Sequence, residues 1–143
     1  MMMDDFFSNE GFNSTVWGPS AWALIHIVGA NVPLRPTARE AVAYHTFFKT
    51  LATVLPCSTC RKEYRKLICC GATRLSAGMF QHHKRDPPGG ARVRVFEWTI
   101  RLHDAVNRRK GVSWTSEPGF WARTYARLRR KKTLRLPRMK QNK

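Results

Sequence analysis

The sequence predicts an all-α protein, folded as a small helical bundle. Apolar residues recur at spacings of three and four in several segments, which is the period of an amphipathic helix. No segment alternates apolar and polar residues as a half-buried strand does, and the sequence has no internal repeat. The 143 residues are enough for one domain with its own core.

The first helix is expected to begin at Pro19, because proline favours the first helical position. It should end before Pro33, which pushes the preceding residue out of helical geometry. Four residues at i, i+3, i+4 and i+7 would share one face of this helix: Trp22, Ile25, His26 and Gly29.

The second helix is expected over residues 37–54. Thr37, followed three residues later by Glu40, is the signature of a capping box at a helix start. The apolar stripe of this helix would consist of Ala41, Tyr44, Phe48, Leu51 and Leu55. Pro56 should stop the helix and lead into a third one, which begins with the segment CSTC.

Glycine and proline are frequent in residues 71–92, which should form a connection with at most a short helix. A fourth helix is expected over residues 92–109, with a broad apolar face and with Gly111 capping its end. A fifth is expected over residues 116–131, with Ser116 as its N-cap.

The net charge of +17 is very high for this length and suggests an anionic partner such as nucleic acid or a membrane surface. Residues 120–143 hold ten Lys and Arg and no acidic residue, so much of the charge belongs to an appendage. We therefore expect a flexible lead-in at 1–15, a functional domain at 16–128 and a basic tail at 129–143. We expect neither a membrane span nor a secretory signal, because no apolar run of about 20 residues and no basic–apolar N-terminal pattern is present.

Cys57 and Cys60 form a CxxC pair at the start of the predicted third helix. The positive end of the helix dipole and the adjacent Arg61 and Lys62 would stabilise a thiolate, the reactive form of cysteine. One helical turn separates the two cysteines, and this spacing suits a disulfide that opens and closes. A redox role is therefore one interpretation of this pair.

A zinc site is the other interpretation of the same cysteines. Further ligands could come from Cys69 or Cys70 and from His82 or His83. These residues lack the paired spacing that makes zinc motifs specific, and adjacent ligands could share one metal only with strain. The CxxC pair by itself leaves the redox and zinc interpretations level.

A redox CxxC in a helical bundle needs an electron acceptor, and a flavin can take two electrons from a thiolate. A flavin site requires aromatic walls, hydrogen-bonding groups and cations for the phosphates. The residues that could supply them are Trp17, Trp22, His26, Trp98, His103, Asn107, Arg108, Arg109, Lys110 and Trp114. Taken singly, Trp22, Trp98 and His103 are better explained as core residues.

Three segments in order, WGPSAWALIH, LPCSTC and FEWTIRLHDAVNRRKGVSW, closely resemble the motifs of the Erv/ALR family of FAD-linked sulfhydryl oxidases. The match spans Trp17 to Trp114 and looks most like the minimal oxidases of large cytoplasmic DNA viruses. It implies a four-helix bundle with a short fifth helix, FAD bound between the helices, and a homodimer. Two positions depart from the family pattern, since Asp104 replaces an Asn and Leu55 replaces an aromatic residue.

The resemblance also implies roles for individual residues. Cys60 would be the thiol next to the flavin, and Cys57 would be the thiol that exchanges with the substrate. No metal ligand is implied. The implied FAD-binding residues are Trp17, Gly18, Trp22, His26, Trp98, His103, Asp104, Val106, Asn107, Arg108, Lys110 and Trp114.

The implied activity is that of an FAD-dependent thiol oxidase, which forms disulfides in protein substrates and reduces O₂ to H₂O₂. The partners would be thiol-containing proteins, including a viral thioredoxin-like shuttle, and the basic tail would contact nucleic acid or virion components. The implied locations are the cytoplasm of an infected host cell and the virion, with the nucleus reached through the basic tail. The alternative function is a basic nucleic-acid-binding protein with a Cys/His zinc site.

Overall fold

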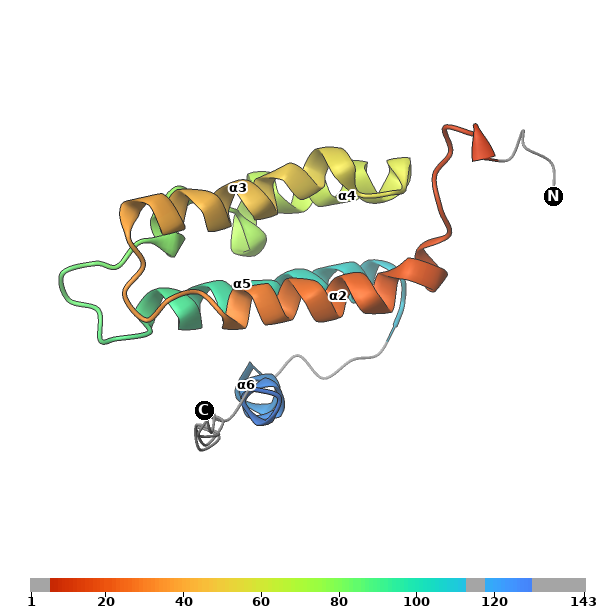
Figure 1. Cartoon of the computed structure of the whole chain (residues 1–143). Helices are drawn as coiled ribbons and strands as arrows, with labels where there is room; N and C mark the ends of the chain where they lie inside the picture. The colour runs from red at the N-terminus through yellow and green to blue at the C-terminus, as the bar shows by residue number, and fades with distance from the viewer. Residues whose placement is uncertain (1–5, 113–117, 130–143) are drawn as a thin grey trace, which may run out of the picture.

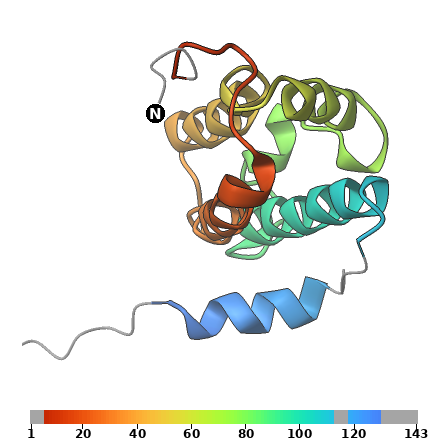
Figure 2. The same ribbon diagram turned by 90° about the vertical axis from the view of Figure 1, so that its right-hand side faces the viewer.

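The fold is an all-helical bundle, seen in a computed structural model that describes residues 6–112 and 118–129 (Figure 1). Four helices pack together, and a fifth runs across two of them (Figure 2). The helices are α2 (Ser14–Ala30), α3 (Ala38–Val54), α4 (Ser58–Cys69), α5 (Gly90–Arg109) and α6 (Pro118–Arg127). No strand occurs in the described residues, so the predicted fold class is confirmed. None of the described helices has the length and apolar character needed to cross a membrane.

Helix α2 begins five residues before the predicted start at Pro19, so that prediction was wrong. Asn13 is the N-cap, and its side-chain oxygen accepts from the backbone N–H of Thr15 at 3.0 Å. Pro19 lies inside the helix and cannot donate to the carbonyl of Thr15, but Thr15 is exposed and water can reach that carbonyl. The helix ends at Ala30, before Pro33 as predicted.

The predicted boundaries of α3, α4 and α5 agree closely with the structure. The predicted end of the fifth helix at residue 131 was wrong, because α6 ends at Arg127 and Leu128 and Arg129 are not helical. Thr37 and Glu40 form the complete capping box of α3, with backbone-to-side-chain distances of 3.1 and 2.8 Å. Helix α5 begins two residues before its predicted start and ends at Arg109, as predicted. Gly111 follows the C-cap with φ +69°, the left-handed conformation that favours glycine. The connection between α4 and α5 contains two short 3₁₀ turns, η1 (Gly71–Thr73) and η2 (Ala77–Phe80). Ser116, the predicted N-cap of the fifth helix, lies outside the described residues.

The core lies between α2, α3, α4, α5 and η2, where Phe48, Phe80 and Trp98 are almost fully buried. The rings of Phe48 and Trp98 meet edge to face with centroids 5.1 Å apart. Helix α2 approaches α5 closely at Gly29, where an added Cβ would lie 3.0 Å from Thr99 Cγ2. This packing fixes α2 and α5, which carry most of the predicted site residues.

Candidate active site

Cys57 and Cys60 form a disulfide at the N-terminus of α4, where the sequence predicts the pair to lie. Cys57 is the N-cap, and its sulfur accepts from the backbone N–H of Cys60 at 3.2 Å. The Cα atoms are 5.2 Å apart, and both residues are half-buried. The helix N-terminus therefore directs a backbone donor at the sulfur of Cys57, where it would stabilise a thiolate after the disulfide opens.

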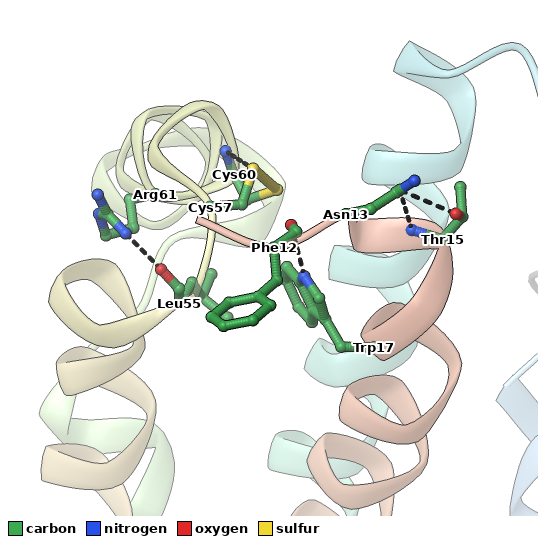
Figure 3. The surroundings of a disulfide bond; sticks show 8 residues. All are labelled: Phe12, Asn13, Thr15, Trp17, Leu55, Cys57, Cys60 and Arg61. Carbon is green, nitrogen blue, oxygen red and sulfur yellow. Dashed lines mark hydrogen bonds between the residues drawn. A yellow bond between two sulfur atoms is a disulfide. The ribbon is translucent and has the colours of Figure 1, made fainter. Parts of the chain in front are cut away.

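A short N-terminal strap, residues 11–13, joins the disulfide loop to α2 (Figure 3). Gly11 forms an isolated antiparallel bridge with Cys57, and the backbone N–H of Phe12 donates to the carbonyl of Pro56 at 2.7 Å. The carbonyl of Phe12 accepts from Trp17 Nε1 at 3.0 Å. The strap thus connects the main chain at Cys57 to a tryptophan of the first helix.

Gly11→Ala is expected to release the strap at a cost of about 1–3 kcal/mol in the free energy of unfolding, because the new Cβ meets backbone. Gly11 has φ +89°, and an added Cβ would lie 2.5 Å from the carbonyl oxygen of Pro56. Urea unfolding and amide hydrogen exchange at Phe12 measure the effect. Gly71→Ala is the matched control, because Gly71 also has positive φ but no atom within 4 Å of the added Cβ. Equal losses in both variants would show that the contact with Pro56 contributes nothing.

A cleft of about 430 Å³ opens between α2, α4 and α5, directly beside Cys60. This volume is typical of sites for small molecules and cofactors. Seven of the site candidates predicted from the sequence line the cleft, namely Trp17, Gly18, Trp22, Cys60, Val106, Arg109 and Lys110. The lining is mainly apolar and aromatic, with two cations, Arg109 and Lys110, among its residues. A second cavity, between α2, α5 and α6, has no cysteine in its lining.

The remaining predicted site residues do not line this cleft. Trp98 lies in the core, where its Nε1 donates to the carbonyl of Thr73 at 2.9 Å, so the structure does not bring it to the site. Asp104 pairs with the exposed Arg108 at 2.9 Å. The backbone carbonyl of Asn107 accepts from the backbone N–H groups of Lys110 and Val112, which follow the end of α5. Trp114 lies outside the described residues.

His26 and His103 lie behind Trp22 as a hydrogen-bonded pair. The ring of His103 stacks on Trp22 with centroids 4.0 Å apart. Because the Thr99 hydroxyl donates to the carbonyl of Phe96 at 2.6 Å, it accepts from His26 Nδ1 at 2.9 Å. The Nε2 atom of neutral His26 then accepts from Nδ1 of His103, also at 2.9 Å. A backbone carbonyl thus sets the tautomers of both rings behind the cleft.

Both histidines are neutral at pH 7. Burial, and secondarily the nearby His103, lowers the pKa of His26 to about 3. Burial, and secondarily Lys110, lowers the pKa of His103 to about 4. In the folded protein these two histidines take up protons only at low pH, whereas in the unfolded chain they take up protons with a pKa near 6.5.

The free energy of unfolding is expected to fall as the pH drops from about 6.5 toward about 4, the value to which the pKa of His103 is lowered. The sign follows because the unfolded chain binds protons before the folded one does, at up to about 1.4 kcal/mol per pH unit and proton. Urea unfolding at stepped pH measures this slope. His103→Gln should flatten it, and His83→Gln, at an exposed histidine, should not. A slope unchanged by His103→Gln would exclude the buried pair as its cause.

Several cleft residues were not predicted as part of the site: Leu55, Thr59, Glu63 and Tyr64. Glu63 forms ion pairs with Arg109 of α5 and with Lys66, the latter at 3.3 Å. Tyr64 donates to the carbonyl of Phe48 at 2.6 Å, and burial raises its pKa. Cys60, Glu63 and Tyr64 lie at i, i+3 and i+4, so helical periodicity applied to the CxxC helix would have found the last two.

The other two cysteines lie at the far end of α4 from the disulfide. Cys69 and Cys70 are exposed free thiols with sulfurs 3.2 Å apart, and their hydrogen bond raises the pKa of Cys69. His82 contacts Arg35, and His83 contacts the carbonyl of Gly78. Among the described residues, no three His, Cys, Asp or Glu side chains lie together where they could hold a metal ion. The geometry thus gives no support to the zinc alternative.

The fold and the site together define a helical-bundle protein built around a CxxC disulfide and an adjoining aromatic cleft. The chain belongs to the Erv1 / Alr family, whose family model matches residues 19–125. The resemblance inferred from the three sequence motifs is therefore confirmed.

Similar proteins include two viral proteins and one yeast protein, each named as an FAD-linked sulfhydryl oxidase. The protein of Acanthamoeba polyphaga mimivirus is 30% identical over 102 residues, which are 71% of this chain and 64% of the relative. The protein of Invertebrate iridescent virus 6 is 40% identical over 45 residues, which are 32% of this chain and 40% of the relative. Mitochondrial ERV1 of Saccharomyces cerevisiae is 25% identical over 92 residues, or 64% of this chain and 41% of the relative. The chain thus spans less than two thirds of each relative's length.

The crystal structure of the yeast Erv1 core is similar in fold. It superposes with a TM-score of 0.63 at 22% sequence identity, covering 80% of this chain and 84% of the yeast one. A mutant form of Erv1 from Saccharomyces cerevisiae gives the same TM-score at 21% identity. At this identity the similarity establishes the all-helical architecture.

Proposed function

We propose that the protein is an FAD-dependent thiol oxidase, which forms disulfides in protein substrates through Cys57 and Cys60 and transfers the electrons to O₂, yielding H₂O₂. The names of the relatives, all FAD-linked sulfhydryl oxidases, support this activity. The observation that carries the proposal is the position of Cys60, which belongs to the disulfide and also lines the aromatic cleft.

The residues of the cleft fit FAD. Trp17 and Trp22 offer aromatic surfaces for a flat ring system, and Arg109 and Lys110 offer cations for its phosphates. His103 and Asn107 remain candidates for the adenine and ribose end, whereas Trp98 supports the site from the core. Bound FAD would supply a two-electron acceptor beside Cys60, from which O₂ takes the electrons as H₂O₂.

The two cysteines have different tasks in the proposed exchange. A substrate thiolate attacks the sulfur of Cys57, the Cys57–Cys60 bond breaks, and Cys60 leaves as a thiolate. A second substrate thiolate then attacks the substrate sulfur of this mixed disulfide, so the substrate departs oxidised and Cys57 becomes a thiolate. Cys57 is the point of attack because Cys60 faces the cleft that the cofactor would fill. The N–H of Cys60 stabilises the Cys57 thiolate.

Purification of the full chain tests this function directly. The protein should be yellow with flavin absorbance, should hold no stoichiometric zinc, and should consume O₂ when given dithiothreitol. Colourless protein containing one equivalent of zinc would overturn the proposal and favour the basic nucleic-acid-binding alternative.

The proposal extends to partners and location. The oxidase domain would span residues 16–128 and work as a homodimer on thiol-containing proteins, a thioredoxin-like shuttle among them. Because two of the relatives are viral, we place it in the cytoplasm of infected cells and in virions. The basic tail, residues 129–143, would contact nucleic acid or virion components and could direct the protein to the nucleus.

A further inference from the structure

Helix α4 carries a basic stripe on its exposed side, formed by Lys62, Arg65 and Lys66. These residues lie at i, i+3 and i+4, so their side chains share one face. The opposite face of α4 packs into the core through Tyr64 and Leu67. The stripe is therefore a solvent-facing surface on the same helix that holds the disulfide.

Most of the positive charge on this surface is not neutralised within the described residues. Glu63, the single acidic residue of α4, already pairs with Lys66 and Arg109. Lys62 and Arg65 take part in none of the ion pairs of the described chain. Among the described residues, Glu10 immediately precedes the strap and is exposed, and its single negative charge is smaller than the two positive charges of Lys62 and Arg65.

The basic stripe is close enough to the disulfide to act on a substrate that is reacting there. Lys62 follows Cys57 by five residues and Arg65 by eight, which corresponds to a rise of about 7.5 and 12 Å along the helix axis. These separations are comparable to the Debye length of about 8–10 Å at moderate salt. An extended peptide covers such a distance with two to four residues at about 3.3 Å each.

We propose that protein substrates dock an acidic segment on the basic stripe of α4 while one of their thiols reaches Cys57. This inference rests on the proposed thiol-oxidase function and specifies its substrate class: dithiols flanked by Asp or Glu. Complementary charge raises the rate of encounter and selects against basic partners. Small uncharged dithiols gain nothing from the stripe.

Two synthetic peptides with the same Cys-x-x-Cys pair, one flanked by Glu and one by Lys, test the proposal on the full-length flavoprotein. At low salt we expect kcat/KM for the Glu peptide to exceed that for the Lys peptide by about tenfold or more, as steering allows. The preference should shrink as salt is added. Dithiothreitol measures the activity that does not depend on charge.

Lys62→Glu/Arg65→Glu should abolish or invert this preference. The rate with each peptide is divided by the same variant's rate with dithiothreitol, so that any change in the reactivity of the Cys57 thiolate cancels. The matched control is Lys84→Glu/Arg85→Glu, which changes the net charge equally at two exposed residues. In the loop that carries these two residues, the backbone N–H of Gly89 donates to the carbonyl of Leu34, just before α3 begins. This loop is therefore near the start of α3, whereas Cys57 follows the end of that helix. Loss of the preference in both variants, or in neither, would overturn the proposal. The proposal would also be overturned if Lys62 and Arg65 bound an RNA homopolymer while kcat/KM was the same for the Glu and Lys peptides.

A measurement without the flavin separates this inference from the proposed function. In Cys60→Ser/Cys69→Ser/Cys70→Ser protein, Cys57 is the one remaining cysteine of the chain. It displaces a coloured aromatic thiol from peptides activated as mixed disulfides, and the colour reports the exchange rate. Faster exchange with the Glu peptide supports docking, even if the wild-type protein fails to oxidise dithiothreitol and the oxidase function is rejected. Equal exchange rates for both peptides overturn docking, even if the protein is an active oxidase.

Discussion

Cys57→Ser protein is expected to lose dithiol-dependent O₂ consumption by a factor of about a thousand or more, the scale seen when a nucleophile is removed. The substrate then has no sulfur to attack, because Cys60 faces the cleft and loses its disulfide partner. FAD should stay bound, since Cys57 does not line the cleft. An oxygen electrode and the flavin absorbance of the purified variant give both values.

Cys69→Ser is the control for this experiment. Cys69 is an exposed free thiol at the other end of α4, so its loss should leave turnover unchanged. Activity retained in Cys57→Ser would show that a different cysteine exchanges with the substrate. Activity lost in Cys69→Ser would show that the exposed pair takes part in the electron path.

Trp98→Ala is expected to lower the free energy of unfolding by about 3–5 kcal/mol, enough to unfold a marginal domain. Trp98 is 1% exposed and packs against Phe48, so truncation leaves a large cavity. Trp98→Phe keeps an aromatic ring but leaves the carbonyl of Thr73 without its donor, which should cost about 1–3 kcal/mol. Urea unfolding measures both changes.

Trp22→Ala should affect FAD binding more than stability, whereas Trp98→Ala should affect stability more than FAD binding. Trp22 is half-buried and lines the cleft, so its truncation should cost less stability and should strongly reduce retention of FAD. Flavin content per folded protein separates the two tryptophans. If Trp98→Phe lost FAD without losing stability, the assignment of Trp98 to the core would be wrong.

Features that depend on neighbouring residues were predictable from the sequence. The capping box of Thr37 and Glu40 depends on four consecutive residues. Pro56 ends the preceding helix, so the CxxC pair falls at the start of the next one. The start of α2 was missed because Asn13 and Pro19 give competing local signals, and only the packed structure decides between them. Pro19 is tolerated because the carbonyl it leaves unpaired belongs to the exposed Thr15.

Features that depend on contacts between distant segments were harder to predict. The sequence places Trp98 and His103 on a broadly apolar helix, but it does not tell which of them faces the core. The structure turns Trp98 toward Phe48 and His103 toward Trp22. The pairing of Gly11 with Cys57 had no local signal at all, because it joins two segments that meet only in the folded chain.

That pairing also bears on the order in which the protein folds. Gly11 and Cys57 are far apart in sequence, so their contact closes a long loop and becomes favourable only after α3 and α4 have packed. The strap should therefore dock late, and Cys57 should be more accessible to other thiols in a folding chain than in the finished one. In pulsed amide exchange during refolding, Phe12 should gain protection after the amides of α3. Simultaneous protection would contradict this order.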